Sequence, residues 1–164
     1  MQSLADDFGI IIVAPDSRGE TWDSSRGGLG PDVEFIDRVL HHVFAHYPID
    51  PQRIAIAGFS DGASYALTLG IINGDLFTHI IAFSPGYVAT NYANGHPQIF
   101  VSHGNQDEIL DVEKTSRFIV PGLQRNGFHV TYREFNGPHT VPPEIAREAM
   151  VWWLSGAAPH GAAE

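Results

Sequence analysis

The chain contains no cysteine among its 164 residues, so disulfide bonds, thiolate metal sites and a cysteine nucleophile are all excluded. Basic residues are also few: nine Lys and Arg stand against 19 Asp and Glu, which gives a formal net charge of -10. The basic residues are scattered along the chain rather than clustered. This distribution argues against nucleic acid or an anionic membrane surface as the main partner.

Long hydrophobic runs, repeats of fixed period and low-complexity segments are missing as well. The N-terminal stretch MQSLADDFGIIIVAP has acidic residues before a short apolar run and no basic region, so it resembles neither a signal peptide nor a transmembrane helix. We therefore expect a cytoplasmic protein. The length and a hydrophobic content of 43% predict one globular domain over residues 1–155, followed by a flexible tail at 156–164.

What the sequence does contain is an alternation of short apolar runs with segments of helical spacing. Strands are expected at 9–15, 53–59, 80–84, 98–103 and 128–135, and helices at 31–47, 61–73, 112–126 and 142–154. The run GIIIVAP is rich in β-branched residues, which is typical of a strand buried on both faces of a parallel sheet. The alternation predicts an α/β fold with a mostly parallel sheet of about five strands flanked by helices. The active and binding sites of such sheets lie at the carboxyl ends of the strands.

The second expected strand ends in the pattern GFSDG, which places Ser60 between a strand and a helix. Flanking glycines allow the sharp turn that lifts a serine hydroxyl above a sheet, so Ser60 is the candidate nucleophile. The alternative is a serine that only caps the helix. If Ser60 is the nucleophile, the backbone N–H of Asp61 is the natural first donor to an oxyanion, because it lies at a helix N-terminus.

A serine hydroxyl needs a base, and the base needs a carboxylate to orient it. The loop SHGNQDEIL after the fourth expected strand supplies Asp107, with Glu108 and Asp111 as rivals. The loop NGPHTVPP after the fifth supplies His139. The chain order of Ser60, Asp107 and His139 is the order found in α/β-hydrolases, and each residue follows a different strand.

Together, the blocks GFSDG, SHGNQD and GPHT resemble the three catalytic blocks of the α/β-hydrolase fold. More narrowly they are similar to carboxylesterase/phospholipase-like serine esterases and acyl-thioesterases, with some likeness to polyhydroxyalkanoate depolymerases and feruloyl esterases. The resemblance extends over nearly the whole chain. It implies cleavage of small-molecule esters through an acyl-serine intermediate, in which Ser60 attacks, His139 acts as base and then acid, and Asp107 orients His139. It implies no metal and no organic cofactor.

The sequence departs from this family in its N-terminal part. It has no counterpart of the strands that usually precede GIIIVAP, and none of the His-Gly-Gly type oxyanion loop. We therefore expect a minimal, N-terminally truncated version of the fold. The missing third strand of the family would lie inside the sheet, so either GIIIVAP pairs directly with RIAIAGF or another chain fills the gap. Because both leave apolar surface uncovered, we predict a homo-oligomer, most simply a dimer, with the truncated side at its interface.

The second oxyanion donor must then come from elsewhere, and the loop after GIIIVAP is the candidate, through Ser17 or one of its neighbours. If nothing replaces that donor, activity should fall by a factor of about 10² to 10³. Trp22, Phe59 and Tyr87 are candidate substrate-binding residues, although Trp22 is equally well explained as a packing residue. His42 and His46 have the spacing of a helical metal pair, but a third ligand is not indicated and a solvated helix face is favoured.

Three functions remain open at this point. The short loops favour a serine esterase for short acyl chains. The alternatives are a catalytically weak or inactive hydrolase remnant, and an acyl-thioesterase or lysophospholipase for longer chains.

Overall fold

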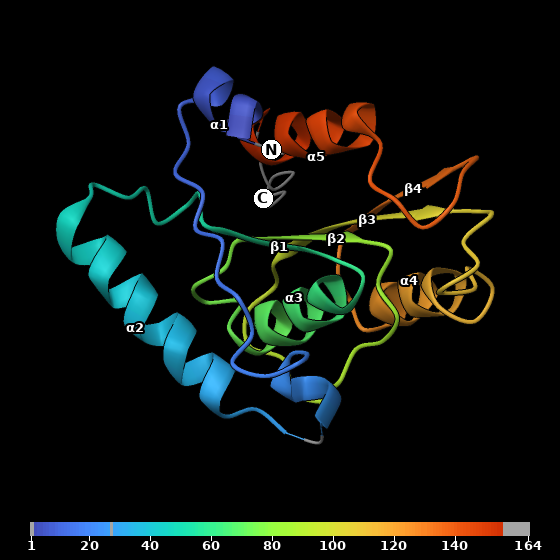
Figure 1. The fold of residues 1–164 in the computed structure, drawn as a ribbon, viewed down its shortest axis with the longest axis horizontal. Helices are drawn as coiled ribbons and strands as arrows, with labels where there is room; N and C mark the ends of the chain where they lie inside the picture. Colours follow the sequence, from blue (N-terminus) through green and yellow to red (C-terminus); the bar gives the residue numbers. More distant parts are fainter. Residues whose placement is uncertain (1, 27, 156–164) are drawn as a thin grey trace, which may run out of the picture.

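The computed structural model describes residues 2–26 and 28–155, which form a parallel sheet flanked by helices (Figure 1). The strands are β1 (Ala55–Phe59), β2 (His79–Phe83), β3 (Gln98–Gly104) and β4 (Val130–Phe135), and they lie in the order β1-β2-β3-β4. The helices are α1 (Gln2–Phe8), α2 (Pro31–His46), α3 (Asp61–Ile72), α4 (Ser116–Arg125) and α5 (Pro143–Ser155), with a short 3-10 turn η1 at Asp23–Arg26. The expected tail at 156–164 lies outside the described residues.

The two faces of the sheet are buried by different helices, as the alternation of side chains along a strand requires. Ile80 and Ala82 of β2 pack in a core with residues of α3 and α4, whereas Ile81 and Phe83 pack in a second core with α5. Figure 1 shows the same layering, with α3 and α4 on one side of the sheet and α1 and α5 on the other. The α/β class and the parallel sheet predicted from the sequence are confirmed.

The prediction of a strand at Gly9–Pro15 is wrong. Within the described residues the sheet has four strands rather than about five. The segment runs from α1 toward η1 without joining a ladder, so the direct pairing of GIIIVAP with RIAIAGF is also wrong. Its β-branched residues favour an extended backbone, but a strand exists only where a neighbour accepts its hydrogen bonds. Ile11 and Ile12 are 50% and 42% exposed instead of buried.

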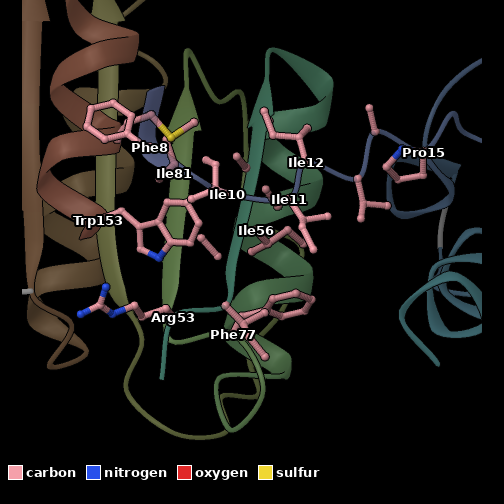
Figure 2. Close-up of a pocket in the computed structure, with 18 of the residues that line it drawn as sticks. Phe8, Ile10, Ile11, Ile12, Pro15, Arg53, Ile56, Phe77, Ile81 and Trp153 are labelled. Atoms are coloured by element: carbon pink, nitrogen blue, oxygen red, sulfur yellow. The ribbon is translucent and has the colours of Figure 1, made fainter. Parts of the chain in front are cut away.

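A large apolar groove of about 1390 Å³ lies along the free edge of β1. Figure 2 draws Ile10, Ile11 and Ile12 lining this groove together with Ile56 of β1 and Trp153 of α5. Residues of α2 line the groove as well. Helices α2 and α5 therefore border it, whereas the segment Gly9–Pro15 that runs along it is not a strand. β1 itself is hydrogen-bonded within the sheet on one side only, to β2.

Over residues 2–26 and 28–155, no helix combines the length and the apolar character needed to cross a membrane.

Candidate active site

Ser60 occupies a strained turn between β1 and α3. Its backbone φ is 58°, a left-handed conformation that non-glycine residues rarely adopt and that tends to mark functional sites. The backbone N–H of Ser60 donates to the carbonyl of Phe83 at 2.9 Å, which ties the turn to the end of β2. Gly58 is required for this turn, because a Cβ there would overlap the Gly62 carbonyl and lie 2.7 Å from the Ala63 nitrogen.

The structure brings Ser60, Asp107 and His139 together from the ends of β1, β3 and β4. The Nε2 atom of His139 lies 2.8 Å from the Ser60 hydroxyl, and its Nδ1 atom lies 2.5 Å from Oδ2 of Asp107. A carboxylate can only accept, so Nδ1 carries a hydrogen and a neutral ring keeps Nε2 free to accept the Ser60 proton. This is the relative geometry of a nucleophile, a base and an orienting acid.

Asp107 is held in its ionised form by hydrogen bonds. Its side chain is fully buried, and its Oδ1 atom accepts the backbone N–H groups of Ile109 at 2.9 Å and Leu110 at 2.7 Å. Burial favours the neutral acid, but these two bonds and the one from His139 outweigh it and hold the pKa of Asp107 below its ordinary value. The rival carboxylates Glu108 and Asp111 are both exposed, and Asp111 pairs with Lys114 instead.

The loops that carry Asp107 and His139 are joined by backbone hydrogen bonds. Asn105 donates its N–H to the carbonyl of Phe135 and Gln106 donates to that of Gly137, both at 2.9 Å. Gly104 lets the two loops come this close, since a Cβ there would overlap the carbonyl oxygens of Gly137 and Pro138. These bonds hold the loop of Asp107 against the loop of His139.

The side chain of Asp61 connects the Ser60 turn to two further loops. It accepts hydrogen bonds from the Thr21 hydroxyl, from the Trp22 backbone N–H at 3.3 Å and from the Tyr87 hydroxyl at 3.2 Å. Burial, the largest effect on Tyr87, raises the pKa of its hydroxyl, which therefore stays protonated as a donor. Through these bonds, the loop before η1 is held against Asp61, the first residue of α3.

The remaining candidate residues are placed differently from one another. Phe59 is 40% exposed, and its ring lies against that of His139 with centroids 4.6 Å apart. Trp22 stacks on Tyr65 at 4.5 Å, which is the packing role considered as its alternative. The Ser17 hydroxyl donates to the carbonyl of Gly19 at 2.8 Å, so a contribution to an oxyanion site through its backbone N–H stays a prediction.

Sequence reasoning missed His103 and the Asp61 side chain as parts of this constellation. His103 is completely buried beside Asp107, and its place four residues before that carboxylate at a strand end was the available signal. The contacts of Asp61 join segments some forty and twenty-six residues away, so no local pattern indicates them. Within the described part of the chain, no three His, Asp or Glu side chains are grouped to hold a metal ion. The rings of His42 and His46 lie against each other, and Nδ1 of His46 lies 2.7 Å from the backbone carbonyl oxygen of His42.

Comparison with known proteins gives a consistent result. The model of the phospholipase/carboxylesterase family matches residues 33–148, which is more than half of the chain. The chain is 28% identical over 120 residues to a poly(3-hydroxybutyrate) depolymerase of Ralstonia pickettii. It is 25% identical over 120 residues to the bifunctional acetylxylan esterase/xylanase XynS20E of Neocallimastix patriciarum. These alignments cover 57% and 72% of this chain but only 24% and 18% of the two relatives.

Solved structures resemble the chain in the same way. The esterase PE8 superposes with a TM-score of 0.65 at 25% identity, covering 74% of this chain and 59% of PE8. The carboxylesterase of Bacillus cereus superposes with a TM-score of 0.61 at 20% identity, covering 76% and 61%. At that identity the second likeness concerns the fold alone. The chain therefore spans less than two thirds of either structure.

Proposed function

Because the chain belongs to the phospholipase/carboxylesterase family, we propose that it is a serine hydrolase that cleaves carboxylic esters through an acyl-serine intermediate. The observation that supports this most is the 2.8 Å contact between the Ser60 hydroxyl and Nε2 of His139, whose other nitrogen contacts Asp107. The names of the relatives, which include an esterase and a depolymerase of a polyester, point to the same bond type.

In the proposed first step, the Ser60 oxygen attacks the ester carbonyl while His139 takes its proton at Nε2. Asp107 stabilises the resulting imidazolium through Nδ1–H without taking the proton itself. The tetrahedral intermediate collapses when His139 returns the proton to the leaving alkoxide, which departs as the alcohol and leaves the acyl group on Ser60. Water then attacks this acyl-serine with the same base, releasing the carboxylic acid and restoring the hydroxyl.

The negative oxygen of the tetrahedral intermediate needs donors at a fixed place. We assign the first to the backbone N–H of Asp61, because this group begins α3 and follows the nucleophile directly. The second is assigned to the loop that contains Ser17, which is held near the Ser60 turn through the bonds of Thr21 and Trp22 to Asp61.

We expect the preferred esters to have short acyl chains, since within the described residues the connections after β1 carry no additional helix or strand that could form a lid over Ser60. The test measures kcat/KM on p-nitrophenyl esters from acetate to octanoate, with Ser60→Ala as the control. The acetate and butyrate esters should be cleaved fastest. Turnover no greater than that of Ser60→Ala would contradict the proposed hydrolase, and a preference for octanoate would contradict the short-chain assignment and favour a long-chain thioesterase or lysophospholipase.

We also propose that two copies of the chain associate through the groove beside β1. Large apolar side chains with at least 40% exposure gather there: Ile11, Ile12, Val13, Phe44 and Phe59. The groove is bordered by an unpaired strand edge, which favours pairing with another chain. A second copy presents the same free β1 edge and the same exposed apolar side chains of Gly9–Pro15, as a twofold-symmetric contact between identical patches requires.

The dimer is tested by size-exclusion chromatography with light scattering. The wild type should elute at twice the monomer mass of 17.9 kDa. Ile12→Asp should dissociate it, whereas Phe118→Asp should not, because Phe118 is equally apolar and 71% exposed but does not line the groove. A wild-type mass of 17.9 kDa would overturn the proposal.

A further inference from the structure

His103 is a completely buried histidine beside the proposed triad, near the carboxyl end of β3. Burying an imidazole costs free energy unless both ring nitrogens find partners. Here both do: Nδ1 lies 2.7 Å from the hydroxyl of Ser116, and Nε2 lies 2.8 Å from the carbonyl oxygen of Leu110. Ser116 is also completely buried, so water does not compete for the contact at Nδ1.

The partners determine where the hydrogens lie on His103. A carbonyl oxygen only accepts, so Nε2 must carry a hydrogen and donate it to Leu110. In the neutral ring Nδ1 is then an acceptor, and the Ser116 hydroxyl is its donor. The N–H of the ring is thereby aimed at the loop that carries Asp107.

Leu110 links this N–H to the proposed acid. Its carbonyl receives the bond from His103, and its backbone N–H donates to Oδ1 of Asp107 at 2.7 Å. The same Nε2 atom of His103 lies 3.1 Å from Oδ2 of Asp107, which is the oxygen that contacts His139. His103 therefore lies beside both carboxylate oxygens: its Nε2 atom is 3.1 Å from Oδ2, and the residue that accepts its N–H donates to Oδ1.

We propose that His103 is a positioning residue that fixes Asp107, and through it the ring of His139, in the orientation needed for proton transfer from Ser60. The inference rests on the proposed hydrolase function and extends it by a fourth side chain that contacts neither the ester nor the reacting atoms. Orientation at this level matters, because a misplacement of about 1 Å can reduce a rate by about 100-fold.

Two substitutions of His103 distinguish the contribution of Nε2 from that of Nδ1. A glutamine amide reaches about as far as Nε2 and still offers an N–H donor to the Leu110 carbonyl beside Asp107, whereas an asparagine amide reaches only as far as Nδ1. If His103 positions Asp107, His103→Asn lowers kcat by as much as about 100-fold and leaves KM nearly unchanged. His103→Gln retains most of the wild-type kcat. Equal kcat values for the two variants would overturn the proposal.

Ser116→Ala serves as the matched control, because it removes the partner of Nδ1 and leaves both contacts of Nε2 in place. The variant should lose stability with little change in kcat. A fall in kcat as large as that of His103→Asn would show that the buried cluster matters only for packing, and would contradict the assignment to Nε2.

A second measurement does not depend on turnover. The proton between His139 Nδ1 and Asp107 is expected as a low-field NMR resonance, assigned by its loss in His139→Ala. Its exchange with solvent should be slow in the wild type and in His103→Gln, and faster in His103→Asn. If the wild type has no activity above Ser60→Ala, the proposed hydrolase fails, and equal exchange rates in the two His103 variants would still overturn the positioning role independently.

Discussion

The two glycines of the GFSDG turn have unequal roles. A Cβ at Gly58 would overlap the backbone of the first turn of α3, whereas at Gly62 its nearest neighbour outside the helix is Nε1 of Trp22 at 3.6 Å, an ordinary contact. The pattern of two glycines is therefore a sterically strict requirement at one position only. This difference is not apparent from the motif, in which both residues look equivalent.

Gly58→Ala and Gly62→Ala form a matched pair that tests this asymmetry. The added methyl group at residue 58 must push the turn aside, so we expect a loss of about 1 to 3 kcal/mol in stability and about 100-fold in kcat. Gly62→Ala should retain most of the wild-type stability and most of the wild-type kcat. Urea unfolding and ester hydrolysis measure the two quantities, and comparable losses in the two variants would contradict the role given to Gly58.

The lowered pKa of Asp107 predicts how stability depends on pH. A carboxyl whose pKa is lower in the folded state stabilises that state above the unfolded pKa, about 3.9, and the contribution disappears as pH falls through the folded value. The difference in unfolding free energy between the wild type and Asp107→Asn should therefore be largest at neutral pH and shrink below about pH 4.

Urea unfolding at intervals from pH 7 to pH 3 measures this difference. Glu108→Gln is the control, since it removes one charge from the same loop at an exposed position. A difference between wild type and Asp107→Asn that grows on acidification would contradict the direction of the pKa shift.

At the scale of elements, the candidate site is formed by the loops that follow the strands of the sheet. Parallel strands end at one edge, so residues that follow different strands become neighbours, and this is why Ser60, Asp107 and His139 were recognisable as a set from the sequence. The helices α2, α3 and α5 also follow the expected spacing closely. Helix α4 begins at Ser116 rather than near Val112, because the preceding residues form turns in which the Thr115 hydroxyl bonds the carbonyl of Asp111.

What the sequence could not reveal depends on contacts between distant segments. Gly9–Pro15 has the composition of a strand, but composition does not supply a neighbouring strand, and the segment remains without a ladder. His103 lies in β3 close behind the apolar run Ile99–Val101, and only the folded loop brings the Leu110 carbonyl to its ring. Local patterns indicate elements and their ends, whereas pairing and buried polar partners are properties of the assembled fold.

The close approach of the loops after β3 and β4 predicts the effect of a methyl group at Gly104. Gly104→Ala places a Cβ against the carbonyls of Gly137 and Pro138, so the loop that carries His139 must move away. We expect a fall of about 100-fold in kcat with little change in KM. Gly122→Ala in α4 is the control and should raise stability by about 0.5 to 1 kcal/mol, because only the Arg125 side chain lies near. Unchanged kcat in Gly104→Ala would contradict the coupling of the two loops.

At the scale of the whole molecule, charge opposes the proposed dimer while the groove favours it. Each copy carries a formal net charge of -10, so two copies repel each other at low ionic strength. Raising the salt concentration shortens the Debye length from about 30 Å at 0.01 M to about 10 Å at 0.1 M and screens this repulsion.

The dissociation constant of the dimer should therefore fall as salt rises over that range. Analytical ultracentrifugation at several NaCl concentrations measures the trend. An interface held by ion pairs would show the opposite dependence, and such a result would contradict association through the apolar groove.

The strand order β1-β2-β3-β4 has a consequence for the nascent chain. Each strand pairs with the one synthesised just before it, so the sheet can grow from β1 toward β4 as the chain emerges, without waiting for distant partners. The Ser60 turn needs only β1, β2 and α3, whereas His139 arrives after the last strand. During synthesis the Ser60 turn can therefore form before His139 has emerged, so in the proposed mechanism the nucleophile has no base until the loop after β4 has folded.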